Sequence, residues 1–180
     1  MASTTIWTIG HGNRAAEEFV GLLQAAGIAR VVDVRAYPAS RRHPHFGRAA
    51  LEESLGAAQL RYTWEGAALG GRRRPSKNSP NTALRNAAFR AYADHMATAQ
   101  FLEGASRLLD IARDERAAVM CAERLPWQCH RFLISDYLVA QGIQVVHLVG
   151  TASAQEHRLN PIARVREGAL VYDGNTQLEL

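Results

Sequence analysis

A short stretch near the middle of the chain concentrates several chemically reactive side chains. Residues 119–131 read VMCAERLPWQCHR. An apolar run ends at Cys121, the chain turns at Pro126, and a helical pattern begins at Cys129 or His130. This pattern predicts a strand, a short loop and the start of a helix, which is where open α/β sheets hold their sites.

Cys121 is a candidate nucleophile. A cysteine that ends a strand just before a helix lies near the partial positive charge of backbone N–H groups, and nearby arginines would lower its pKa further. Glu123 or His130 would then transfer protons. A structural thiol is the alternative, because free cysteine is among the most buried residue types.

The same stretch also allows metal binding or a disulfide. Thiolate, imidazole and carboxylate ligands suit zinc or iron, and the candidates are Cys121, Glu123, Cys129 and His130, together with His11. The spacing differs from a zinc-finger C-x2-C pair, and adjacent residues on a helix point in different directions. We therefore assign no metal ligand. A reversible Cys121–Cys129 disulfide is weaker still, because the pair lacks the C-x-x-C arrangement.

Charged residues also end an earlier apolar stretch. Asp33 and Arg35 lie two positions apart, so their side chains share one face of a strand. They could form a salt bridge, or Asp33 could act as a general base while arginines clamp a phosphate. Charge inside a strand is costly unless paired, so we expect a compensating network. The arginines expected to bind anions are Arg14, Arg35, Arg41 and Arg131.

The elements that must position these residues are strands alternating with helices. Apolar or β-branched runs predict strands at residues 5–9, 31–35, 60–64, 117–121 and 144–149. Helical spacing predicts a first helix capped by Asn13 and stopped at Gly27. Further helices are expected at residues 49–55, 89–96, 101–112 and 129–141, and residues 169–172 suggest a small strand or hairpin.

This order predicts a single doubly wound α/β domain over residues 1–180. Its mainly parallel sheet would have about five strands with helices on both faces, and residues 152–180 would form an extension at the edge. Loops that follow parallel strands lie along one edge and can share a crevice. The residues expected there are His11, Asn13, Arg14, Asp33, Arg35, Ser40, Arg41, Cys121, Glu123 and His130.

The composition is that of an ordinary globular protein. The chain has 180 residues, of which 47% are hydrophobic and 21% charged, which excludes disordered and collagenous classes. Two cysteines are too few for a secreted disulfide scaffold, and the first apolar run is too short for a signal peptide or a membrane span. We therefore expect a cytoplasmic protein that is not bound to membranes.

The net charge of +4 comes mainly from arginine, since Lys77 is the one lysine. Arginine binds phosphate and carboxylate through a planar fork, so an anionic partner is plausible; a genome that favours arginine codons is the alternative. Residues 69–81 are the most basic segment and could form a lid or a phosphate-binding loop, although a charge run is usually a solvated face. His147, inside a strand, is expected to be a satisfied core histidine.

Four segments carry a family resemblance. They are TIGHGNR at residues 8–14, VDVR at 32–35 followed by PASRR at 38–42, LGG at 69–71, and MCAE at 120–123 with CHR at 129–131. Together they resemble the bacterial and archaeal family catalogued as domain of unknown function 488. The resemblance implies a compact cytosolic α/β domain but no particular activity. The family's usual serine at position 12 is glycine here, so no hydroxyl role is expected at that position.

A fainter resemblance leads to rhodanese sulfurtransferases. In those proteins a cysteine after a strand opens a loop of backbone N–H groups around an anion. Here Pro126 interrupts that loop, and Trp127 breaks the pattern of a cysteine and an arginine separated by five residues. Sulfur transfer is therefore a minor alternative.

These observations favour an enzyme that acts on an anionic, phosphate-bearing substrate such as a nucleotide or a nucleic-acid end. The alternative is a nucleic-acid-binding or regulatory module that uses residues 72–74 and has structural thiols, although no helix-turn-helix, RNA-binding signature or zinc finger is present. The sequence identifies no cofactor and no oligomeric state. The expected catalytic residues are Cys121, Glu123, Asp33 and His11; the expected substrate-binding residues are Asn13, Arg14, Arg35, Ser40, Arg41, His130 and Arg131.

Overall fold

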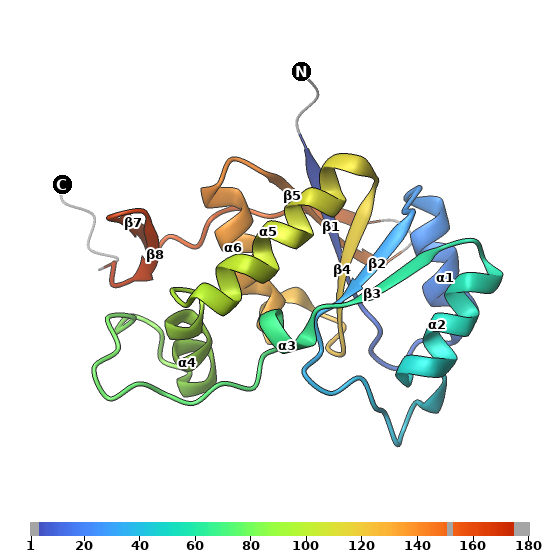
Figure 1. Ribbon diagram of the computed structural model, residues 1–180, viewed down its shortest axis with the longest axis horizontal. Helices are drawn as coiled ribbons and strands as arrows, with labels where there is room; N and C mark the ends of the chain where they lie inside the picture. Colours follow the sequence, from blue (N-terminus) through green and yellow to red (C-terminus); the bar gives the residue numbers. More distant parts are fainter. Residues whose placement is uncertain (1–3, 151–152, 175–180) are drawn as a thin grey trace.

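A six-stranded sheet forms the centre of the computed structural model, which describes residues 4–150 and 153–174 (Figure 1). The strand order is β3-β2-β4-β1-β5-β6. The first five strands of this order are parallel, and β6 pairs antiparallel with β5. The strands are β1 (Thr5–Gly10), β2 (Arg30–Asp33), β3 (Arg61–Trp64), β4 (Ala117–Cys121), β5 (Gln144–Gly150) and β6 (Ser153–Glu156).

Helices cover both faces of this sheet, which confirms the predicted doubly wound α/β fold. In Figure 1, α1 and α2 lie to one side of the strands and α4, α5 and α6 to the other. Among the described residues no helix has both the length and the apolar character that a membrane crossing needs. The helices are α1 (Ala16–Ala25), α2 (Arg48–Ala57), α3 (Gly66–Leu69), α4 (Ala87–His95), α5 (Ala99–Asp114) and α6 (Arg131–Ala140), with short 3-10 helices η1 (Pro44–Phe46) and η2 (Pro126–Gln128).

The central strand β4 divides the hydrophobic core into two layers. All of its residues are buried. Val119 and Cys121 belong to the cluster that packs under α4–α6, whereas Ala118 and Met120 belong to the cluster under α1 and α2. Successive side chains of a strand point to opposite faces, so a strand covered on both sides reads as a continuous apolar run.

Strand ends fix the position of the site. Gly10 at the end of β1 pairs with Cys121 at the end of β4, and Asp33 at the end of β2 pairs with Met120. The loops that leave these three parallel strands therefore emerge side by side at one edge. The sequence predicted a shared edge from the alternation of strands with helices.

The expected cap of the first helix is wrong. Ala15, not Asn13, occupies the N-cap position of α1, and no side chain caps it. The chain after β1 first turns across β4, where Gly12 donates to the Ala122 carbonyl at 2.8 Å and holds a φ of +53°. Glycine adopts this left-handed conformation without strain, so the chain turns at Gly12 and the helix starts later than a cap at Asn13 would place it.

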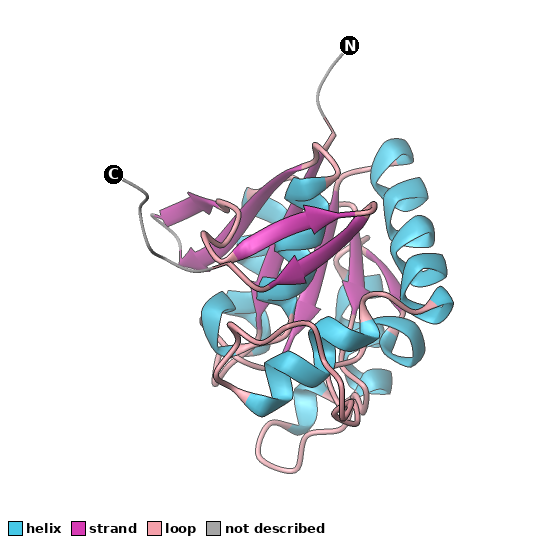
Figure 2. Ribbon diagram, turned by 90° about the vertical axis from the view of Figure 1, so that its left-hand side faces the viewer, coloured by secondary structure: helices cyan, strands magenta, loops and turns pink. Residues whose placement is uncertain are grey.

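The C-terminal region contains a small hairpin beside the main sheet. The small strand or hairpin predicted at residues 169–172 is confirmed, because β8 (Ala169–Tyr172) pairs with β7 (Ala163–Arg166) in a separate two-stranded sheet. Figure 2 shows this hairpin in front of the main sheet. The Tyr172 N–H donates to Asn81 Oδ1 at 2.9 Å, which ties the hairpin to the loop before α4. Of the expected extension over residues 152–180, residues 152 and 175–180 lie outside the described residues.

Candidate functional site

A pocket of about 380 Å³ opens at the carboxyl edge of the sheet. It lies where the loops after β1, β2 and β4 meet, and residues at the start of α4 complete its wall. The predicted site residues that line it are His11, Arg35, Ser40, Cys121, Glu123 and His130; Tyr37, Arg72 and Cys129 also line it.

Cys121, Cys129 and His130 form the most compact reactive group in this pocket. His130 Nδ1 lies 3.8 Å from Cys121 Sγ and 3.7 Å from Cys129 Sγ, and the three donor atoms all lie within 4.8 Å of one another. The expectation that Cys129 and His130 diverge is wrong. Cys129 is extended, with φ −139° and ψ 150°, and α6 begins only at Arg131, so the two residues do not share a helical turn.

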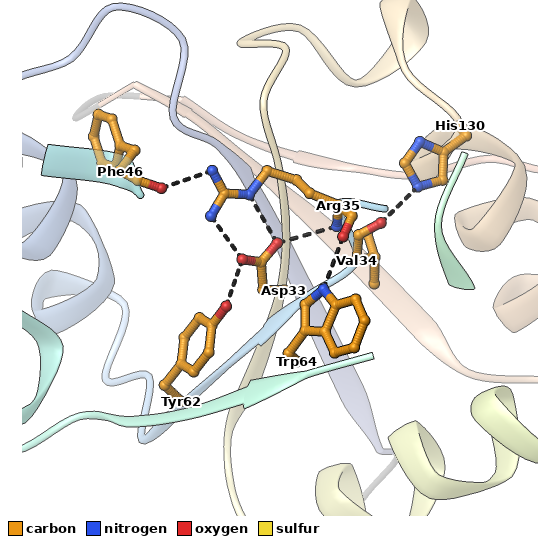
Figure 3. A network of polar contacts seen from close by, with 7 residues as sticks. All are labelled: Asp33, Val34, Arg35, Phe46, Tyr62, Trp64 and His130. Carbon is orange, nitrogen blue, oxygen red and sulfur yellow. Dashed lines mark hydrogen bonds and ion pairs between the residues drawn. The ribbon is translucent and has the colours of Figure 1, made fainter. Parts of the chain in front are cut away.

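A backbone contact orients the His130 ring. Its Nε2 lies 3.1 Å from the Val34 carbonyl oxygen (Figure 3). A carbonyl can only accept, so Nε2 carries a hydrogen, and in the neutral ring Nδ1 then presents its lone pair to the thiols. Gly71 makes room for the ring, because a Cβ there would lie 2.5 Å from Nδ1. Val34, which directly follows β2, and Gly71 therefore fix the orientation of the His130 ring.

Glu123 lies beside this group at the rim of the pocket. The Cys121 thiol donates to Glu123 Oε2 across 3.4 Å. Partial burial opposes ionisation of Glu123, but hydrogen bonds from its own N–H and from the thiols of Cys121 and Cys129 outweigh it and lower its pKa. The neighbouring Cys129 thiol and burial raise the pKa of Cys121 well above its ordinary value. The expected lowering of the Cys121 pKa is thus wrong for the unliganded pocket.

Asp33 and Arg35 form a buried ion pair (Figure 3). Arg35 donates from Nε and Nη2 to the two carboxylate oxygens at 2.9 and 2.7 Å, and from Nη1 to the Phe46 carbonyl at 2.8 Å. Tyr62 adds a hydroxyl donor to Asp33 at 2.7 Å. This network satisfies the fully buried Asp33, as the sequence predicted. Asp33 does not line the pocket. Its ion pair instead holds the Arg35 side chain in the wall of the pocket.

His11 contributes a neutral imidazole. Its ring stacks on Phe46 with centroids 4.4 Å apart, and its Nδ1 lies 2.8 Å from the Gly12 carbonyl oxygen. Burial lowers the His11 pKa to about 4, and the hydrogen bond to Gly12 opposes this only in part. Nδ1 therefore donates to the carbonyl, which leaves the lone pair on Nε2 as a proton acceptor.

Four predicted substrate ligands lie outside the pocket lining: Asn13, Arg14, Arg41 and Arg131. Asn13 and Arg41 are exposed. The Arg14 side chain is fully buried, donates to the Val149 carbonyl at 2.6 Å and pairs with Glu18. Arg14 thus joins the ends of β1 and β5 to the start of α1.

Arg131 also turns away from the pocket. Its Nη1 donates to the Glu123 carbonyl at 2.6 Å and its Nη2 to the Arg124 carbonyl at 2.9 Å, while Nη1 also reaches the Ile9 carbonyl at 3.3 Å. These contacts fasten the loop after β4 to β1. The position of Glu123 therefore depends on Arg131.

Arg72 and Tyr37 are pocket residues that the site prediction did not include. The Arg72 guanidinium lies 5.3 Å from the centroid of the Tyr37 ring, and both side chains are exposed. Arg72 forms no ion pair with any residue in the described ranges. The basic run at residues 72–74 was the available signal, but sequence could not show which of its arginines faces the edge.

The loop after Cys121 ends in the short helix η2. The backbone N–H groups of Gln128 and Cys129 donate to the carbonyls of Leu125 and Pro126. These two donors are therefore not available to a bound anion, and sulfur transfer stays a minor alternative.

Comparisons with known proteins agree with the sequence motifs. The chain matched no curated protein and no solved structure. A family model does match residues 15–138, a range that holds the motifs of β2, β4 and the 69–71 segment. The chain therefore belongs to the family described as Domain of unknown function DUF488.

Proposed function

We propose that this protein is an enzyme that acts on an anionic, phosphate-bearing substrate, such as a nucleotide or a nucleic-acid end, bound in the carboxyl-edge pocket. One observation carries the proposal: thiol, carboxylate and imidazole groups share a pocket with two arginines. A concave site with a few convergent polar groups is the usual form of a small-molecule site, and about 380 Å³ is within its usual range.

The cationic side of the pocket supports an anionic substrate. Arg72 is exposed and lacks an ion-pair partner among the described residues, so its fork is available to a phosphate. Arg35 has further N–H donors beyond the three that Asp33 and Phe46 occupy. Ser40 adds a hydroxyl to the same wall. We assign anion binding to these residues.

The opposite side supports proton transfer and nucleophilic attack. His11 offers a neutral ring nitrogen and Glu123 a carboxylate, and both line the pocket. Either could accept a proton from an attacking group. We assign Asp33 to positioning Arg35, because the hydrogen bonds of its carboxylate run to Arg35 and Tyr62. The two unbridged cysteines suit a reducing compartment, and we place the activity in the cytoplasm.

Binding and turnover test the proposal separately. Nucleoside monophosphates and 5′-phosphorylated oligonucleotides are titrated calorimetrically and then assayed for product by chromatography. Arg72→Ala should weaken binding about tenfold, the value of one charge-assisted contact, whereas Arg113→Ala, which removes an exposed arginine of α5, should not. Glu123→Gln should bind but not turn over. Equal affinities of wild type and Arg72→Ala, together with no turnover of any phosphate ester, would overturn the proposal.

A nucleic-acid-binding module is the second candidate. Arg72, Arg74 and Lys77 are exposed on one loop beside the pocket. Binding through phosphates alone should weaken steeply as salt rises. Strong salt dependence without turnover would favour this candidate, and affinity that is indifferent to salt would exclude it.

A further inference from the structure

Three donor atoms at the base of the pocket have the spacing of a metal site. A tetrahedral zinc ion with ordinary bonds to sulfur and nitrogen places those two ligand atoms about 3.6 Å apart. The separations from His130 Nδ1 to the two sulfurs are 3.7 and 3.8 Å, close to that value. All three donors also lie within 4.8 Å of one another. Small side-chain adjustments would suffice to bind an ion.

Neighbouring backbone groups favour metal binding by the same three side chains. The Val34 carbonyl holds the hydrogen of His130 on Nε2, so the lone pair on Nδ1 faces the sulfurs. A carbonyl or carboxylate partner of this kind is the usual support of a metal-bound histidine. The backbone N–H of Arg131 donates to Cys129 Sγ across 3.5 Å and would stabilise a thiolate there. The ligand set is therefore oriented before any ion arrives.

We propose that Cys121, Cys129 and His130 bind one zinc ion, whose fourth coordination position faces the pocket. Two thiols and an imidazole select zinc over magnesium or calcium, which require oxygen ligands. Binding displaces one proton from each thiol, and the two thiolates neutralise the dication. Three protein ligands with one open position is the arrangement of catalytic rather than structural zinc.

Glu123 gives the fourth position a chemical use. Its carboxylate lies 3.4 Å from Cys121 Sγ at the rim, outside the compact group of three donors. A water molecule on the ion would therefore lie beside a carboxylate that can accept its proton. This inference deepens the proposed function by naming its activating group, but zinc binding itself does not depend on a phosphate substrate.

Metal stoichiometry and spectroscopy test the inference without an activity assay. Untagged protein, purified under reducing conditions without chelators, is analysed by elemental mass spectrometry. Reduced apoprotein is then titrated with Co²⁺ and, in competition with a chromophoric chelator, with Zn²⁺. We expect about one equivalent of metal, tetrahedral Co²⁺ bands and a thiolate charge-transfer band from two sulfurs.

Variants assign the ligands. Cys121→Ser, Cys129→Ser and His130→Ala should each lower zinc affinity by at least about a hundredfold, since losing even a supporting contact costs 10- to 100-fold. Each Cys→Ser variant should also lose about half of the charge-transfer intensity. Gln128→Ala is the matched control: Gln128 lines the pocket and precedes Cys129 but is not one of the three donors, so affinity should not change.

A second readout covers variants that fail to fold. In the wild-type chain, zinc should protect both cysteines from alkylation, and a chelator should restore their reaction. The inference is overturned if reduced protein binds neither Zn²⁺ nor Co²⁺, if zinc leaves alkylation unchanged, or if folded Cys→Ser variants bind as tightly as wild type. Zinc binding without turnover of phosphate esters would retain this inference and reject the proposed function alone.

Discussion

Two clusters of polar and titratable side chains pack against this sheet. They differ in whether hydrogen bonds within the cluster use all of their donor and acceptor atoms. The pocket cluster of Cys121, Glu123, Cys129 and His130 opens to solvent and directs donor atoms at one another. The second cluster, which we call the buried chain, consists of Thr8, His147, His157, Asp136 and Tyr172, and all of these residues are buried.

The bonds of the buried chain run in one direction. Asp136 accepts from the Tyr172 hydroxyl and from His157 Nε2, both at 2.8 Å. With neutral rings, His157 Nδ1 must then accept from His147 Nε2 at 2.9 Å, and His147 Nδ1 must accept from the Thr8 hydroxyl at 2.7 Å. Every ring nitrogen is satisfied, so this cluster stabilises the fold, whereas the pocket cluster retains capacity to bind.

Removing the acid of the buried chain should have the largest effect on stability. Asp136→Ala leaves the Tyr172 hydroxyl, the His157 ring and the Asn160 N–H without their acceptor. We expect a loss of about 3–5 kcal/mol in the free energy of unfolding, measured by urea denaturation. A loss below about 1 kcal/mol would mean that the buried chain contributes little and that the contrast between the clusters is false.

Low pH should destabilise the folded protein at the buried chain through protonation of His147. Burial, followed by the electrostatic influence of the neighbouring His157 and Arg131 side chains, lowers the His147 pKa to about 3. Between about pH 6.5 and pH 3 the unfolded chain therefore holds a proton on this residue that the folded chain lacks. Stability should rise with pH through that window and be complete above it.

The size of this effect can be isolated with a variant. The His147 shift corresponds to about 3 kcal/mol at pH 4 relative to pH 7. Urea denaturation of wild type and His147→Gln at both pH values measures it, because the variant should lose that part of the pH dependence. His11, with a pKa lowered to about 4, contributes in the same direction and remains in both proteins. Identical pH slopes would contradict a neutral, buried His147.

A methyl group at Gly71 should disturb the pocket cluster instead. Its Cβ would lie 2.5 Å from His130 Nδ1, so the ring must move. We expect Gly71→Ala to cost about 1–3 kcal/mol and to weaken zinc binding. Gly21→Ala is the matched control, since Gly21 lies within α1 and its Cβ would meet no atom within 4 Å. That change should stabilise the protein by about 1 kcal/mol and leave zinc affinity unchanged.

Local patterns predicted the elements and the edge where the site lies. The apolar runs of β4 and β5 and the helical spacing of α5 depend on near neighbours in sequence. The rule that parallel strands release their loops at one edge then placed His11, Arg35 and Cys121 together. The satisfied core position expected for His147 is confirmed by its bonds to Thr8 and His157.

Contacts between distant residues were not predictable in this way. His157 carried no sequence signal, because its partners Asp136 in α6 and His147 in β5 come beside it only in the folded chain, where β6 pairs with β5. Arg14 and Arg131 looked like anion ligands, but both bind backbone carbonyls that only the folded strand ends expose. Composition identifies a charged group, whereas its partner depends on the tertiary structure.

Of these substitutions, Glu123→Gln should change the free energy of unfolding least and reduce turnover most. Glu123 is exposed at the pocket rim, and its side chain contacts the thiols rather than another element of the fold. Glu123→Gln preserves shape and removes a proton acceptor. Its unfolding free energy should stay within about 0.5 kcal/mol of wild type, while turnover falls at least about a hundredfold. Because Asp136→Ala should behave in the opposite way, a Glu123→Gln protein that unfolds as readily as Asp136→Ala would place both acids in the scaffold and remove the distinction between the clusters.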